Sequence, residues 1–335
     1  MVPLIPLVRA TCLVPHIRWL EARDRPVDSY LAAAGVPGDP LEQSERPIPL
    51  RSAFAFLRNV AEGEGVPDLG LQVMTSASFA DLGNYAQVIL GGRSIEQALQ
   101  RASRAMPHFC THEWLDLRRQ PGGAQVIVTF SIGTDQAALH QAQLLTLTFL
   151  FALAAVTRNP GPLAEQIRIV PHPELGFSHL PPEFGAIATP ADDRVMIVSV
   201  GNGVMATPLP RSMTPVTGPG DHDQAWRNLR DQADFRSCAR MLVEGMVEDG
   251  TPDVDLLAKA AGISLRTLQR RLAAEGTSFK ELVDQTRKRN ALAAIAEPGT
   301  AIAEIASAVG YASPSALTRA VRRWKGKPPR ALREK

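Results

Sequence analysis

Lysine is missing from the first 258 residues of this 335-residue chain, and histidine is missing from everything after residue 222. Charge is divided just as unevenly. Residues 225–335 carry 20 Lys and Arg against 13 Asp and Glu, whereas residues 1–224 carry 16 against 21. The formal net charge of the whole chain is only +2 and hides this division. Two segments of opposite charge predict two domains with different partners, and the basic one is the candidate for contact with phosphate.

Cysteine is scarce, and long apolar runs are absent. The three cysteines, Cys12, Cys110 and Cys238, stand far apart, which argues against a zinc site or a disulfide framework and favours a reducing cytoplasm. The N-terminus has two early prolines and no early basic residue, unlike a signal peptide. The most apolar run, Leu144 to Val156, is 13 residues long and too short to span a bilayer. We therefore expect a soluble, cytoplasmic protein without a membrane partner.

One segment marks a boundary between domains. Thr207 to Gly220 holds four prolines and two glycines, a composition that excludes a helix or a central strand. We expect residues 1–206 to form one domain, residues 207–224 a linker, and residues 225–335 a second domain, as the length of the chain allows.

The first domain is expected to be α+β, with helices ahead of a sheet. Periodicity of apolar residues predicts helices at 8–22, 50–62, 94–106 and 136–157. Alternation predicts strands at 112–119, 124–132, 166–170 and 194–200, of which the first two form a hairpin.

The second domain is expected to be all-α. Breaks at glycine and proline leave room for seven helices, near 225–248 (for which a later start also fits), 254–261, 265–274, 278–296, 301–308, 314–325 and 328–333.

Residues 254–272 have the pattern of a helix-turn-helix unit. Ala258 is small enough for two helices to cross closely, and Gly262 follows where the turn needs a positive φ. Ser264 is placed to cap the second helix. Apolar residues fall on one face of that helix, and its other face presents Arg266, Thr267, Gln269, Arg270 and Arg271.

The same pattern returns about 48 residues later. Ala306 and Gly310 repeat the spacing of Ala258 and Gly262, and Ser313-Pro314 is a helix start signal. The outward face of the following helix presents Ser315, Thr318, Arg319, Arg322 and Arg323. A single copy would be weak evidence, because many helical hairpins share it. Two copies, joined by one long helix and each followed by an arginine-rich helix, predict DNA binding.

A recognition helix fits the major groove, where arginine pairs with guanine and glutamine with adenine. Two such helices in one chain could enter successive grooves. The residues predicted to contact DNA are Arg266, Thr267, Gln269, Arg270, Ser315, Thr318, Arg319 and Arg322. Several other basic residues are expected only to position the protein on phosphates, among them Arg271, Lys280, Arg287, Arg323, Lys325 and Lys327.

Residues 225–335 resemble the DNA-binding domain of the AraC/XylS family of bacterial regulators. The similarity is carried by the segments Leu257–Phe279 and Ile302–Pro329 and by the closing Trp-x-Gly-x-x-Pro arrangement. Leu317 and Val321 stand where the family often has phenylalanine, an apolar exchange. More loosely, the first domain resembles the sub-group with an arabinose-binding-type N-terminal domain, through Leu69-Gly-Leu, Asp81–Tyr85, Ile95–Leu99 and Pro208-Leu-Pro210.

The resemblance implies a transcription regulator, such as an activator, that binds promoter DNA and works with RNA polymerase. Its first domain would sense an unknown small-molecule effector or form a homodimer. It implies no cofactor, no metal and no catalytic residue. A first domain that only dimerises, in a protein that binds DNA constitutively, is a second interpretation.

Three other features of the first domain have a functional and a structural interpretation. His108, Cys110 and His112 alternate and would share one face of an extended segment, either as metal ligands or as the polar, half-buried start of a strand. Cys110 could also be a reactive thiol of an enzyme, or of a redox or alkyl-accepting protein, with an attached DNA-binding module. The apolar helix around Leu144–Val156 is either a core helix or the wall of a ligand pocket or dimer face. Nothing in the sequence selects Glu165, Arg168 and His172 over other surface residues as ligand contacts.

Overall fold

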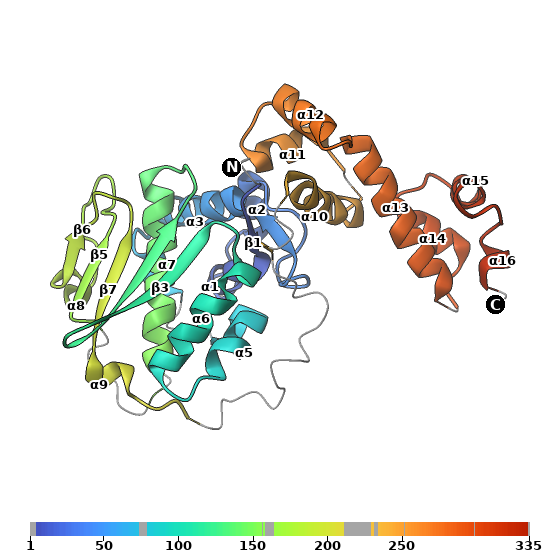
Figure 1. The fold of residues 1–335 in the computed structure, drawn as a ribbon. Helices are drawn as coiled ribbons and strands as arrows, with labels where there is room; N and C mark the ends of the chain where they lie inside the picture. The colour runs from blue at the N-terminus through green and yellow to red at the C-terminus, as the bar shows by residue number, and fades with distance from the viewer. Residues whose placement is uncertain are drawn as a thin grey trace. The chain divides into compact units, whose positions relative to one another are not determined.

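The computed structural model describes residues 5–73, 79–155, 157, 164–210, 229–230, 234–250, 252–297 and 299–333. Figure 1 shows their helices and strands. The chain divides into two compact units. The first unit is Pro6–Gln232, and the second, beginning at Ala233, includes Ile5 from the start of the chain.

The first unit mixes strands and helices, which confirms the predicted α+β class. Its strands are β1 (Leu7–Arg9), β2 (Pro47–Pro49), β3 (Glu113–Gln120), β4 (Gly123–Phe130), β5 (Gln166–Ile169), β6 (Ala188–Pro190) and β7 (Met196–Gly201). Its α-helices are α1 (Val14–Glu21), α2 (Val27–Ala34), α3 (Leu50–Glu64), α4 (Leu69–Gln72), α5 (Gly83–Leu90), α6 (Ile95–Phe109), α7 (Gln136–Ala155), α8 (Pro182–Gly185) and α9 (Asn202–Met205). Two 3₁₀ turns, η1 (Ala10–Leu13) and η2 (Phe79–Leu82), complete the described elements.

Five strands form one sheet in the order β3-β4-β7-β5-β6. Neighbours are antiparallel except β5 and β6, which are parallel. The predicted hairpin is present as β3 and β4, in which Glu113 lies opposite Phe130. Along β3, Glu113 and Leu115 are buried whereas Trp114 and Asp116 are exposed, so that alternate side chains face the interior.

Helix α7 lies at the centre of the first unit. It packs against α3 and α4, and Gly70 of α4 comes so close that a Cβ there would lie 2.8 Å from the backbone nitrogen of Leu145. Its buried polar side chains are also bonded: Gln141 donates to Pro67 O at 2.6 Å, and Gln143 donates to Arg194 O at 3.1 Å. By length and composition α7 could cross a membrane, but 72% of its most apolar window is buried inside the unit. These contacts are those of a core helix.

The start of the chain differs from its prediction. Residues 8–22 were expected to be one helix, but the structure has strand β1, the 3₁₀ turn η1 and only then α1. Strand β1 pairs with β2 so that Val8 lies opposite Ile48. The two prolines of β2 fit this position because, among the described residues, β2 has only one neighbouring strand. Long-range pairing therefore overrides the local helical periodicity, and a small sheet precedes the helices.

Motifs that carried the resemblance have structural roles. Asp81 forms an ion pair with Arg18, and the ring of Tyr85 stacks on Phe109 with centroids 4.5 Å apart. At the end of the unit, Pro208 bridges to Ser94, the residue that caps α6. Of the expected linker, 211–224 lies outside the described residues.

In the second unit the described residues form seven helices, as predicted: α10 (Phe235–Glu248), α11 (Val254–Ala261), α12 (Leu265–Ala274), α13 (Phe279–Ala296), α14 (Ile302–Ala308), α15 (Pro314–Lys325) and α16 (Arg330–Arg333). Five of them begin and end within one residue of their predicted bounds. Helix α10 begins at Phe235, later than the predicted 225, because the Asp234 side chain accepts a hydrogen bond from Ser237 N at 2.6 Å and caps it there.

Candidate nucleic-acid interface

Helices α11 and α12 are joined by a three-residue turn whose geometry follows from Gly262. This residue has φ +65°, a left-handed conformation that glycine adopts without strain. It lets Ile263 N donate to Ala258 O at 3.1 Å and end α11. Ser264 then accepts from Thr267 N at 3.3 Å and begins α12. The local sequence therefore sets the angle at which α12 leaves the turn.

Helices α14 and α15 repeat this geometry. Gly310 has φ +74°, and Tyr311 N donates to Ala306 O at 2.8 Å, the counterpart of the bond between Ile263 and Ala258. The Ser313 side chain accepts from Ala316 N at 3.2 Å, and Pro314 occupies the first turn of α15. The two helix-turn-helix units thus share both their sequence signals and their hydrogen bonds. The connection before α15 is longer, since it covers residues 309–313.

One face of each second helix is buried and holds it in place. Leu268 and Leu272 of α12 are fully buried, and so are Leu317 and Val321 of α15. Leu317 and Val321 pack in a cluster with residues of α13 and α14, so the apolar exchange relative to the family leaves a filled core. Helix α13 connects the two helix-turn-helix units along the chain, and it packs against both α10 and α14.

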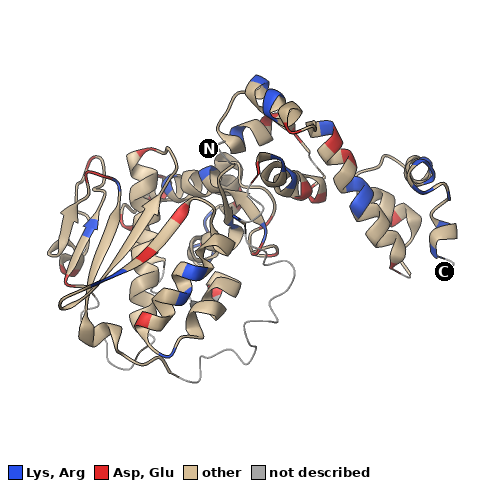
Figure 2. Cartoon of the chain, in the orientation of Figure 1, with Lys and Arg blue, Asp and Glu red and all other residues tan. Residues whose placement is uncertain are grey.

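The residues predicted to contact DNA lie on the opposite faces. Six are exposed, Arg266, Gln269, Arg270, Ser315, Arg319 and Arg322, and two are half-buried, Thr267 and Thr318. Within the described residues, none of the four arginines takes part in an ion pair. Figure 2 shows the basic residues along α12, α13 and α15. Helices α12 and α15 therefore offer guanidinium groups that no carboxylate among the described residues neutralises.

The residues predicted to position the protein on phosphates do not behave alike. The Arg271 guanidinium lies over the Phe235 ring at 5.4 Å, and that of Arg287 lies over Tyr311 at 6.0 Å. These two are half-buried and engaged inside the unit. The remaining four, Lys280, Arg323, Lys325 and Lys327, are exposed. The sequence did not distinguish the two groups because packing against α10 and Tyr311 depends on the tertiary fold.

The His108–His112 segment is not extended. His108 lies in the last turn of α6, and only the residues that follow leave the helix. The described residues contain no group of three His, Cys, Asp or Glu side chains arranged to hold a metal ion. Cys110 is fully buried, and burial raises the pKa of its thiol well above the usual value, with a further contribution from Glu113. His108, Cys110 and His112 therefore do not share one face of an extended segment, as the metal interpretation required.

None of the three surface residues considered as ligand contacts, Glu165, Arg168 and His172, lines the apolar cavity inside the first unit. Arg168 forms an ion pair with Asp193 at 2.9 Å, and His172 lies beside His140 and His179. The cavity is lined instead by residues of α3, α5, α6, α7 and the β3–β4 hairpin. Helix α7 is thus both a core helix and a cavity wall. Glu113 also lines the cavity and was not predicted as a site residue. The sequence pattern that indicates it is an acidic residue at an inward-facing position of a strand.

Comparison with known proteins gives two family matches. A family described as a helix-turn-helix domain matches residues 257–335, and one described as the arabinose-binding domain of AraC transcription regulator, N-terminal, matches residues 25–184. These ranges contain the second helix-turn-helix unit, all but the first three residues of the first one, and most of the first compact unit.

Curated relatives are similar over shorter stretches. The HTH-type transcriptional regulator VirS of Mycobacterium tuberculosis is 38% identical over 92 residues, which are 28% of this chain and 27% of that protein. The ornithine utilization regulator of Pseudomonas aeruginosa is 36% identical over 83 residues, 25% of this chain and 24% of that protein. The chain thus spans about a quarter of the length of these relatives. The solved structure of the transcriptional regulator CdpR from P. aeruginosa covers 80% of this chain and 87% of its own, at 18% identity and a TM-score of 0.37.

Proposed function

Because the chain belongs to the AraC family of helix-turn-helix regulators, with an arabinose-binding-type N-terminal domain, we propose that it binds promoter DNA sequence-specifically and regulates transcription. The observation that carries the proposal is the pair of like helix-turn-helix units in one compact unit, each with an exposed arginine-rich second helix. Residues 1–206, 207–224 and 225–335 then serve as sensing or dimerisation domain, linker and DNA reader.

Helices α12 and α15 are the recognition helices in this proposal. Arg266, Arg270, Arg319 and Arg322 are long enough to reach guanine O6 and N7, and Gln269 can bond the edge of adenine. Ser315 and the two threonines supply shorter contacts to bases or phosphates. Lys280, Arg323, Lys325 and Lys327, all exposed, fix the register through the phosphate backbone. Arg271 and Arg287 support the fold of the reader instead.

The first unit controls the reader in the same proposal. A small-molecule effector or a homodimer contact in residues 1–206 sets whether the recognition helices engage a promoter, and RNA polymerase is the partner that responds. The protein acts in the cytoplasm, where the free thiols of all three buried cysteines are stable. The position of the bound site relative to polymerase decides between activation and repression.

The test is binding of the full-length protein to the promoter beside its own gene and to random DNA, at two salt concentrations. We expect tight binding to the promoter that weakens as salt rises, because released counterions drive the association. Arg266→Ala and Arg319→Ala should each weaken promoter binding by about 1–3 kcal/mol and leave binding to random DNA less affected.

The matched control is Arg118→Ala, which removes an exposed arginine of β3 in the first unit. Its DNA binding should equal that of the unchanged protein. If Arg266→Ala weakened binding to promoter DNA and to random DNA equally, Arg266 would contact phosphate and not a base. Absence of binding at low salt, with or without cell extract as a source of effector, would refute the proposal.

An enzyme that uses Cys110 is the rival from a different class. A fully buried thiol whose pKa is raised is a poor nucleophile, because the thiolate is the reactive form. We therefore expect a thiol reagent to leave Cys110 of the native protein unmodified until the first unit unfolds. Rapid modification at neutral pH would favour the rival.

A further inference from the structure

A cavity of about 70 Å³ lies inside the first unit, between helices α3, α5, α6 and α7 and the β3–β4 hairpin. Its walls are aliphatic and aromatic almost throughout, with Leu57, Phe109, Phe149 and Leu153 among the lining side chains. One water molecule needs about 10–15 Å³ in this measure, so the cavity has room for roughly five to seven groups of that size. An apolar space of this kind is a site for a small hydrophobic molecule.

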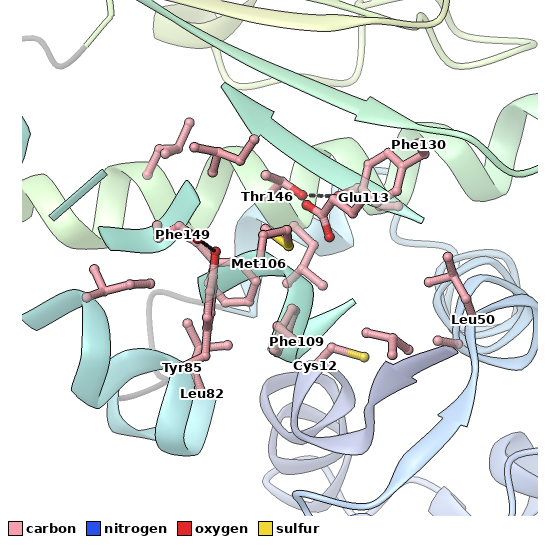
Figure 3. Close-up of a pocket in the computed structure, with 18 of the residues that line it drawn as sticks. Cys12, Leu50, Leu82, Tyr85, Met106, Phe109, Glu113, Phe130, Thr146 and Phe149 are labelled. Atoms are coloured by element: carbon pink, nitrogen blue, oxygen red, sulfur yellow. Dashed lines mark hydrogen bonds between the residues drawn. The ribbon is translucent and has the colours of Figure 1, made fainter. Parts of the chain in front are cut away.

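Of the polar groups in the cavity wall, two hydroxyls already have partners. The Tyr85 hydroxyl donates to Ala102 O at 3.3 Å, and the Thr146 hydroxyl donates to Ala142 O at 3.0 Å. Glu113 differs from both. Its side chain is 7% exposed, and no described residue donates a hydrogen bond to its carboxyl oxygens. Figure 3 shows this carboxyl group pointing into the space between the helices.

The nearest cation does not neutralise Glu113 directly. Arg230 donates to the backbone carbonyls of Thr111 and Glu113, and its guanidinium lies 4.6 Å from the centre of the Trp114 ring. Trp114 is on the outer face of β3, and neighbouring side chains of a strand point to opposite faces. Arg230 thus covers the outer face, whereas the Glu113 carboxyl is on the inner face. Among the described residues, no salt bridge joins the two side chains.

We propose that the cavity binds a small primary amine, whose protonated amino group donates hydrogen bonds to Glu113 and whose hydrocarbon part fills the apolar walls. The ammonium group supplies the hydrogen bonds that the carboxylate lacks, and it adds a positive charge inside the cavity to the attraction that Arg230 already exerts. Charge-assisted bonds of this kind are stronger than neutral ones, and pairing offsets the unfavourable burial of a lone charge. That this ligand is the effector rests on the proposed function, whereas binding itself does not.

The protonation of Glu113 adds a signature to this binding. Burial raises the pKa of its carboxyl to about 8, although Arg230 partly opposes the shift. The other titratable groups facing it are the Cys12 and Cys110 thiols and the Tyr85 hydroxyl, all neutral at pH 7 because burial raises their pKa values. Glu113 is therefore mostly protonated in the empty cavity at pH 7. An incoming ammonium ion displaces this proton, which passes to the solvent.

The experiment is titration calorimetry of the full chain, without DNA, against three probes of equal chain length: n-hexylamine, n-hexanol and hexanoate. We expect one hexylamine per chain, with hexanol at least about tenfold weaker and hexanoate weaker still. Measurements in two buffers with different heats of ionisation count the protons released. Hexylamine should release close to one proton at pH 7 and few at pH 9, and hexanol should release none.

Two variants separate the carboxyl from the cavity. Glu113→Gln should lower hexylamine affinity at least about tenfold, abolish proton release and leave hexanol binding unchanged, which shows that the cavity is intact. Glu183→Gln, at an exposed position of α8, should bind all three probes as the unchanged protein does.

Three results would overturn the proposal: equal binding of amine and alcohol, tighter binding of hexanoate, or no binding of any probe at millimolar concentration. Promoter binding is measured separately, with and without hexylamine. If the protein bound the amine but not DNA, the proposed regulatory function would be refuted and the proposed amine site would stand. If the protein bound DNA but not the amine, the proposed amine site would be refuted and the proposed regulatory function would stand.

Discussion

The two compact units handle ionisable side chains in opposite ways. The first unit buries several, including His16, Glu113 and His140, each less than a tenth exposed. In the second unit no charged side chain among the described residues is buried, and the exposed arginines of α12 and α15 lack ion-pair partners there. The first unit thus buries ionisable groups in their neutral form, and the second exposes charged ones.

This difference separates two kinds of function. A buried ionisable group lowers stability unless a partner compensates for the lost hydration, so such groups mark places where a ligand or a proton acts. Exposed cations without carboxylate partners keep their full attraction for phosphate. The contrast is therefore what we expect if, as proposed, the first unit recognises a small molecule and the second recognises DNA. Four changes test this difference between the units: a change of pH, and substitutions of the buried carboxyl group, of a surface cation and of a helix cap.

Acidification should distinguish the units most strongly. Burial lowers the pKa of His16 to about 3 and that of His140 to about 4. Unfolded histidine takes up a proton below pH 6.5, but these two stay neutral in the fold, so stability is lost as pH falls below 6.5. Between pH 7 and pH 5 the first unit should lose roughly 4 kcal/mol of unfolding free energy.

This loss is best measured in Glu113→Gln, because the buried carboxyl titrates in the opposite sense. Hydrogen exchange at rising urea, followed separately in α7 and α13, reports each unit. The second unit should change little, since no histidine occurs after residue 222. Similar losses in both helices would contradict the assignment of the effect to buried histidines.

Glu113→Gln should by itself stabilise the first unit. Because the pKa of this carboxyl is raised to about 8, the folded state holds a proton that the unfolded chain releases, and stability falls as pH rises from about 4.5 to 8. Glutamine keeps the volume and cannot ionise. At pH 7 the gain in unfolding free energy should be roughly 3 kcal/mol, and it should vanish near pH 4.5. Urea unfolding at both pH values, with Glu183→Gln as control, checks this; a gain independent of pH would refute it.

Five of the seven helices of the second unit could be predicted to within one residue, whereas the starts of α10 and α16 and parts of the first unit could not. Ser264, Gly262, Ser313 and Gly310 are local signals, and each performs its predicted task through bonds within a few residues. The strand β1 depends on pairing with β2, some forty residues away, and its local sequence looked helical. The caps of α12 and α15 are readable from sequence, whereas the start of α10 at the Asp234 cap and the strand pairing of β1 were not predicted.

The candidate sites follow the same rule. Exposure of Arg266 and Arg319 followed from helical periodicity, because an apolar stripe fixes which face is outward. Arg271 was predicted to be a phosphate contact. Its packing on Phe235 of α10 could not be predicted from the sequence, because it depends on the tertiary fold. The cavity draws on segments from β1 to α7, so Glu113 stood out only once these were assembled.

Removing a surface cation should test whether the second unit displays its charge to phosphate. Lys325→Ala changes an exposed residue at the end of α15. We expect promoter and random DNA binding to weaken alike, and the slope of log K against log salt to decrease by about 1. Fluorescence anisotropy at four salt concentrations measures this slope. An unchanged slope would remove Lys325 from the interface, and a loss confined to the promoter would make it a base contact instead.

The smallest expected effect concerns the caps that hold the recognition helices. Ser264→Ala removes the acceptor for Thr267 N, and Ser313→Ala removes the acceptor for Ala316 N. Each should lower the unfolding free energy of the second unit by about 1 kcal/mol. Neither serine is predicted to contact a base, so DNA affinity extrapolated to the fully folded protein should stay the same. Asp234→Ala, which removes the cap of α10, is the matched control, because it destabilises the same unit away from both recognition helices. If Ser264→Ala weakened promoter binding more than Asp234→Ala at equal stability, the cap would set the orientation of α12 on DNA as well as its stability.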